Sequence, residues 1–95
     1  MARGPFRITC INKDDRQSPY ERILRVGGYG TSAWTLTQRE VIQRIKADEE
    51  SFYVERPTGD RVMVIVARSR FGNDYIKTET DGDSPNNLLS LPECP

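Results

Sequence analysis

Apolar and polar side chains alternate along residues 6–12, which is the two-residue period of a β-strand. Residues 20–26 contain three aliphatic side chains and predict a second strand. The glycine-rich residues 27–32 then predict a break in regular structure. The first third of the chain is therefore expected to hold two strands and a loop.

One helix follows, and its start is marked by two signals. Thr37 and Glu40 have the spacing of a capping box, in which each side chain accepts a hydrogen bond from the other residue's backbone. Leu36 and Val41 have the spacing of a hydrophobic staple around the same cap. The apolar stripe of the helix consists of Val41, Ile42 and Ile45.

Three more strands are predicted over residues 51–55, 61–68 and 75–80. Short turns containing glycine separate them, at residues 57–60 and 71–74, so the three strands should form an antiparallel meander. The middle strand is apolar on both faces, which favours a central position in the sheet.

The C-terminal segment carries three leucines, Leu88, Leu89 and Leu91, between prolines. Exposing them would cost stability, so we expect the tail to be docked. The pattern predicts a single α+β domain over residues 1–95, with a mostly antiparallel sheet in the order β-β-α-β-β-β and one principal helix on it.

Histidine is absent, which removes the usual general base and the commonest metal ligand. Cys10 and Cys94 lie too far apart in sequence for a zinc or thioredoxin-like motif. We expect one small core residue and one tail thiol, and a disulfide only if the tail returns beside the first strand. We predict no catalytic residues, no cofactor and no metal, and the acidic loop at residues 81–87 fails the calcium-loop pattern.

Charge is divided unequally along the chain. Residues 1–46 carry nine Lys and Arg against four Asp and Glu, whereas residues 47–95 carry five against ten. The basic half, together with its aromatic residues, suggests nucleic-acid binding. However, the isoelectric point near 6.2 and the lack of a recognisable motif argue against it, and the folded halves are expected to neutralise each other.

Residues 28–33 fit the loose pattern G-x-G-x-x-A, but the helix cap at Thr37 comes too late for a dinucleotide site. Free amides between Gly27 and Thr37 remain a candidate site for a small anion or ligand. Trp34 is expected to cover the sheet as a core or lid residue. The candidate binding surface consists of Arg22, Arg25, Gly28, Tyr29, Gly30, Trp34, Arg39 and Arg44.

Several segments resemble a bacterial family of domains of unknown function, the one catalogued as three-eight-nine-two. The resemblance rests on residues 6–11, 20–23, 34, 52–55, 75–78, 81–82 and 87–94. The last segment contains the unusual Leu-Leu-Ser-Leu-Pro ending. It covers nearly the whole chain and implies a small stand-alone bacterial protein. It carries over no catalytic residues.

The leading hypothesis is a non-enzymatic binding or accessory module that acts on an unknown protein partner through its surface. Nucleic-acid binding by the basic half and ligand binding between Gly27 and Thr37 are the alternatives. No apolar run is long enough for a membrane span, and the start of the chain does not predict a signal peptide. We therefore expect a cytoplasmic protein that is a monomer or a weak homodimer.

Overall fold

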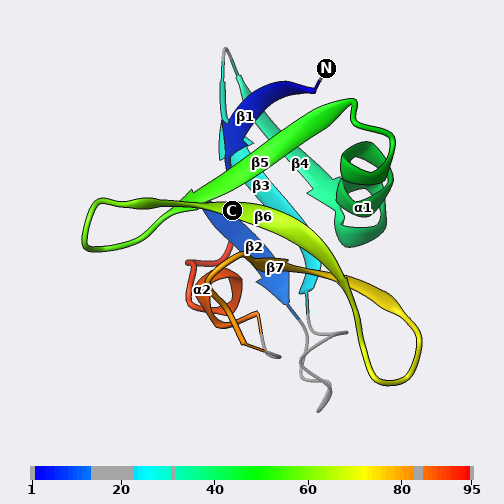
Figure 1. The fold of residues 1–95 in the computed structure, drawn as a ribbon. Coiled ribbons are helices and arrows are strands. Elements are labelled where there is room, and N and C mark those ends of the chain that lie inside the picture. The colour runs from blue at the N-terminus through cyan, green and yellow to red at the C-terminus, as the bar shows by residue number, and fades with distance from the viewer. Residues whose placement is uncertain (1, 14–22, 31, 83–84, 95) are drawn as a thin grey trace.

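The computed structural model describes residues 2–13, 23–30, 32–82 and 85–94, and it confirms an α+β fold (Figure 1). The strands are β1 (Arg3–Arg7), β2 (Cys10–Lys13), β3 (Ile23–Tyr29), β4 (Ala33–Thr37), β5 (Glu50–Glu55), β6 (Arg61–Arg68) and β7 (Asp74–Thr78), and the helices are α1 (Gln38–Lys46) and α2 (Asn86–Leu89). The strands form two sheets, of order β1-β5-β6-β7 and β2-β3-β4. Among the described pairs, β1–β5 is parallel and the others are antiparallel.

The first predicted strand is divided into β1 and β2, which belong to different sheets. The chain turns between them at Ile8 and Thr9. The Ile8 N–H donates to the Tyr53 carbonyl at 2.9 Å, and the Thr9 N–H donates to the Gly27 carbonyl at 2.8 Å. Successive backbone groups thus bond to opposite sheets, and this corner joins the two layers.

The predicted break at residues 27–32 is wrong for its first three residues. Gly27, Gly28 and Tyr29 continue β3, which pairs antiparallel with β4, a strand that the sequence pattern did not indicate. The beginning of the second predicted strand, residues 20–22, lies outside the described residues.

Gly27 and Gly28 are glycines because other atoms occupy the space of a side chain on each face of β3. A Cβ atom at Gly28 would lie 2.2 Å from the Arg7 carbonyl oxygen and 2.8 Å from Cζ2 of Trp34. A Cβ atom at Gly27 would lie 2.9 Å from the sulfur of Cys10. Any side chain here would push the neighbouring segments away.

The predicted helix begins where its cap signals indicated. The Glu40 N–H donates to the Thr37 hydroxyl at 3.1 Å, and the Thr37 N–H donates to the Glu40 carboxylate at 3.0 Å, so the capping box is confirmed. These bonds to Thr37 lower the pKa of Glu40. The helix buries Val41 against both sheets and ends at Ala47, whose N–H donates to the Gln43 carbonyl.

Gln38, the first residue of α1, bridges the two sheets. Its amide nitrogen donates to the Ile23 carbonyl of β3 at 2.9 Å, and its amide oxygen accepts from the Ile76 N–H of β7 at 2.9 Å. Ile23 and Ile76 are both buried, so these bonds satisfy backbone groups that water does not reach.

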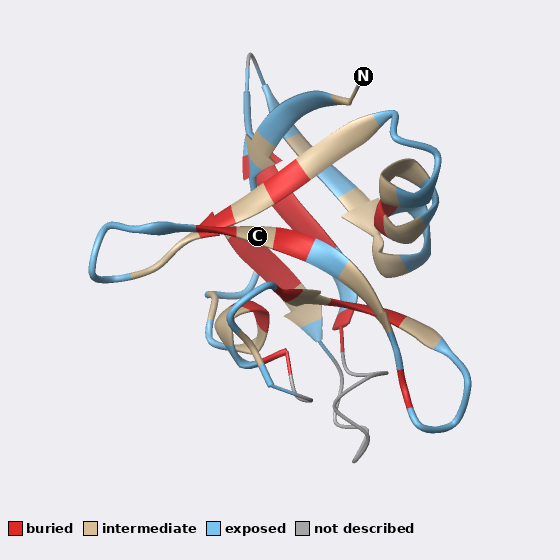
Figure 2. Ribbon diagram, in the orientation of Figure 1, coloured by how far each residue is buried: buried red, intermediate tan, exposed pale blue. Residues whose placement is uncertain are grey.

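The last three strands form the predicted antiparallel meander, with β6 between β5 and β7. The predicted central position of β6 is confirmed, although only one of its faces is buried. Val62 and Val64 face the core, whereas Ile65 on the other face keeps 36% of its surface exposed. Figure 2 shows the buried positions gathered where the sheets face each other and the exposed ones at the hairpin ends.

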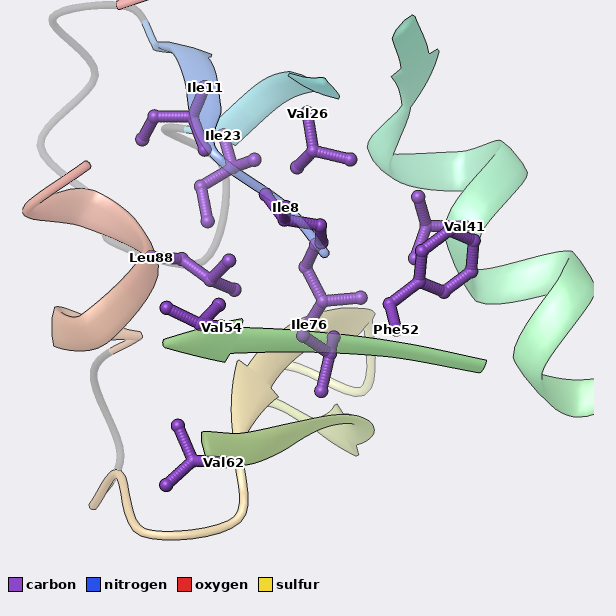
Figure 3. Close-up of a cluster of buried hydrophobic side chains, with 11 residues drawn as sticks. Ile8, Ile11, Ile23, Val26, Val41, Phe52, Val54, Val62, Ile76 and Leu88 are labelled. Carbon is purple, nitrogen blue, oxygen red and sulfur yellow. The ribbon is translucent and has the colours of Figure 1, made fainter. Parts of the chain in front are cut away.

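The leucine tail is docked, as expected, and Leu88 of α2 is completely buried. Figure 3 shows Leu88 and Val41 entering the core from opposite sides, from α2 and α1. Beyond α2 the chain runs beside β2, where the Ile11 N–H donates to the Pro92 carbonyl and the Cys94 N–H to the Ile11 carbonyl. The tail therefore covers the edge of β2.

The expectation of two separate thiols is wrong, because Cys10 and Cys94 form a disulfide. Their Cα atoms are 4.9 Å apart, since the tail returns beside β2. Disulfides persist in oxidising compartments and are rare in the cytoplasm. The bond therefore counts against a cytoplasmic location, which stays a prediction.

Replacing Gln38 by alanine should destabilise the domain by about 2 kcal/mol or more, because two buried backbone groups lose their partners. Gln43→Ala, at an exposed position of the same helix, is the matched control and should change stability by less than about 0.5 kcal/mol. Urea unfolding measures both. Equal effects of the two substitutions would refute the bridging role.

Reducing the Cys10–Cys94 bond should lower the free energy of unfolding by about 4 kcal/mol, since it closes a loop of 84 residues. The reduced domain should still fold, because Leu88 and the backbone bonds of the tail remain. Urea unfolding with and without a reductant gives the difference. Two reactive thiols in the untreated native protein would contradict the bond.

Candidate functional site

A small pocket of about 160 Å³ lies between the two sheets beside α1. We call it the Trp34 pocket. Its lining residues come from β1, β4, α1 and β5 and are Phe6, Trp34, Leu36, Arg44, Glu50 and Phe52. Four of the six are apolar. The surface they present is therefore suited to an apolar group rather than to a polar one.

Three aromatic rings form the floor of the pocket. The ring centroids of Phe6 and Phe52 are 6.0 Å apart, and those of Trp34 lie 6.5 Å from Phe6 and 5.9 Å from Phe52. Phe52 is buried, whereas Phe6 and Trp34 are partly buried and pack against the core. Trp34 is thus a covering residue, as expected, and its exposed part also lines the pocket.

Gly28 contributes to this site through its missing side chain. It stands directly opposite Trp34 in the β3–β4 pair, and the indole ring lies over it. A side chain at position 28 would meet the ring and displace it. Gly28 and Trp34 are thus in contact, and the absence of a side chain at Gly28 leaves room for the indole ring. Their role in binding stays a prediction.

An ion pair borders the pocket. Arg44 donates from Nη1 to the Glu50 carboxylate at 2.6 Å, and this hydrogen bond raises the pKa of Arg44. Arg3 approaches the other carboxylate oxygen at 3.7 Å. The side chains of Arg3 and Arg44 are 78% and 37% exposed, but that of Glu50 is only 13% exposed. The charge that an incoming molecule meets is therefore chiefly positive.

The other described residues of the predicted surface do not line this pocket. Tyr29 is 67% exposed at the end of β3, and Gly30 follows it in the hairpin turn. Arg25 is exposed on β3, opposite Thr37. Arg39 lines a separate polar groove between α1 and the β6–β7 turn. Arg22 lies outside the described residues.

Two of the backbone groups that the anion hypothesis would use are engaged within the fold. Gly28 lies in the β3–β4 ladder, and the Thr37 N–H donates to Glu40. The Gly27–Thr37 segment is a hairpin followed by a capped helix rather than an open loop. Anion binding there stays a prediction, and the apolar side of the hairpin lines the Trp34 pocket.

Basic residues of the first half pair with acids of the second half. Lys46 contacts Asp74 at 2.6 Å, and Arg7 contacts Glu55 at 3.1 Å. The pair with Lys46 lowers the pKa of Asp74. Together with the Arg3 and Arg44 contacts to Glu50, these pairs fit the expectation that the folded halves neutralise each other. Nucleic-acid binding stays a prediction.

The sequence patterns did not bring Phe6, Leu36, Glu50 and Phe52 into the candidate site. Phe6 and Phe52 were both placed in strands, but their meeting depends on the parallel pairing of β1 with β5, in which they are direct partners. Short-range patterns do not contain that pairing. Leu36 carried a signal, since a residue before a helix cap often packs on the first turn.

No helix among the described residues is long and apolar enough to cross a membrane.

Comparison with known proteins gives a family but no activity. No curated protein and no solved structure matches the chain. One family model, described as "Protein of unknown function (DUF3892)", matches residues 7–92. This match spans both helices, every strand from β2 to β7 and five of the six lining residues of the Trp34 pocket. The chain therefore belongs to the DUF3892 family of proteins of unknown function.

Proposed function

We propose that this domain is a non-enzymatic binding module that receives one apolar side chain of a partner protein in the Trp34 pocket. The supporting observation is the size and lining of the pocket. A closed apolar cavity of about 150 Å³ holds a single benzene ring, and this pocket measures about 160 Å³. Pockets for drug-sized ligands and cofactors are larger, about 300–1,000 Å³.

The polar residues of the pocket also favour binding over catalysis. Among the described lining residues Glu50 is the one carboxylate, and Arg44 holds it in an ion pair. The Arg44 guanidinium donates to one oxygen of this carboxylate at 2.6 Å, and Arg3 approaches the other oxygen at 3.7 Å. Both oxygens of Glu50 are thus engaged by side chains of the domain itself. The pair is therefore better suited to fixing the pocket and orienting a partner.

An isolated side chain should bind weakly but specifically. Burial of one apolar side chain contributes about 1.5–3 kcal/mol, which corresponds to a dissociation constant on the order of 10 mM. Trp34 is the only tryptophan, so its fluorescence reports on the pocket directly. N-acetyl-leucinamide should shift the emission and saturate, whereas N-acetyl-alaninamide should not.

Leu36→Phe, which fills the pocket, should abolish the response to N-acetyl-leucinamide. Leu24→Phe introduces the same change at a leucine of β3 that is 44% exposed, and it should leave the response intact. Urea unfolding of both variants checks that each is folded. A leucinamide response that is the same in Leu36→Phe and the unchanged protein would sink the proposal.

A further inference from the structure

Two of the sheet edges are covered by this chain itself. On β7, the Ile76 N–H donates to Gln38 and the Thr78 N–H donates to the Asp81 carboxylate at 2.9 Å. On β2, the tail accepts from and donates to Ile11. Such cover prevents edge strands from pairing with other chains. The edge of β4, which borders the Trp34 pocket, has no such cover from the described residues.

The backbone of Thr35 points toward the outer edge of β4, with which no strand of the described residues pairs. Its partner on β3 is Gly27, whose carbonyl accepts from Thr9 on the β2 side. In antiparallel pairs, hydrogen-bonded and non-bonded partners alternate. The Gly27–Thr35 pair is therefore non-bonded, and the N–H and C=O of Thr35 face away from β3. Thr35 and its neighbour Ala33 are both exposed.

The side chains on either side of Thr35 line the pocket. Trp34 and Leu36 project from the opposite face of the strand and line the pocket. A strand that bonds to the backbone of Thr35 would place its next residues opposite Trp34 and Leu36, with side chains on the pocket face. In a single register, the added strand therefore hydrogen-bonds to the backbone of β4 and places a side chain in the pocket.

We propose that the partner is an extended peptide segment that adds to β4 as a further strand. It places one apolar side chain in the Trp34 pocket and an adjacent Asp or Glu beside Arg3 and Arg44. The acidic residue follows from the charge at the mouth, where the two guanidinium groups are more exposed than Glu50 between them. Main-chain bonds then give affinity, and the pocket gives specificity. This inference rests on the proposed function and adds the form and charge of the partner.

The probe is a displayed library of random twelve-residue peptides, from which binders are selected and then titrated as free peptides. Selected peptides should share an apolar residue next to Asp or Glu. Thr35→Pro removes the outward N–H at a position where an edge strand tolerates proline, and it should weaken binding at least tenfold. Thr35→Val keeps the N–H and should bind within about twofold of the unchanged domain.

Two charge-reversing substitutions test whether the partner carries an acidic residue. Arg3→Glu should weaken peptide binding at least fivefold at low salt, and added salt should reduce this difference. Arg39→Glu makes the same change beside the separate groove on α1 and should leave binding unchanged. Equal effects of the two substitutions would show that the acidic residue does not meet the pocket mouth.

Hydrogen exchange in the unchanged domain tests strand addition without any substitution. The Thr35 amide should exchange rapidly alone and become protected when a selected peptide is bound. Peptide binding without this protection would overturn strand addition. So would a selection that yields no peptide whose binding depends on the pocket. Neither outcome affects the binding of N-acetyl-leucinamide. Loss of leucinamide binding instead refutes the proposed function. Protection that rises with the concentration of the domain alone would identify a second copy as the occupant and overturn the peptide proposal.

Discussion

The close approach of three segments at Gly27 and Gly28 determines how this fold is assembled. On one face of β3, the carbonyl of Arg7 and the indole of Trp34 fill the position of a side chain at Gly28. On the other face, the sulfurs of Cys10 and Cys94 fill the corresponding position at Gly27. The N-terminal strand, the β4 hairpin and the C-terminal tail therefore meet at two adjacent residues that have no side chains.

This contact also creates the pocket. Because the chain turns at Ile8 and Thr9, Phe6 stays with the first sheet while the following residues join the second. Phe6 and Phe52 then face Trp34 across the gap between the layers. The helix closes one side of that gap and supplies Arg44. The apolar pocket is thus a consequence of where the two sheets separate.

Local signals in the sequence predicted much of the fold. The capping box placed the start of α1 correctly, and the turns placed the meander of β5, β6 and β7, because both depend on residues close in sequence. The glycines between β3 and β4 misled the prediction. Two adjacent glycines usually indicate a loop. Gly27 and Gly28 are instead strand residues, and they lack side chains because segments distant in sequence pack against them.

The candidate site was predicted only in part for the same reason. Trp34 and Arg44 were identified from their types and positions, whereas Glu50 and Phe52 reach the pocket through the parallel β1–β5 pairing. The disulfide was left open because it required knowing that the tail returns beside β2. Long-range pairing and contacts between layers are the information that one sequence does not display.

The most direct test compares alanine at Gly28 with alanine at Gly30. Gly28→Ala should destabilise the domain by about 3 kcal/mol or more, because the new methyl group meets the backbone of Arg7. It should also move the fluorescence of Trp34. Gly30 has no described atom within 4 Å of a Cβ position, and its φ lies outside the left-handed region. Gly30→Ala should therefore be neutral or slightly stabilising. Similar stability and emission for the two variants would contradict the close approach on which this account depends.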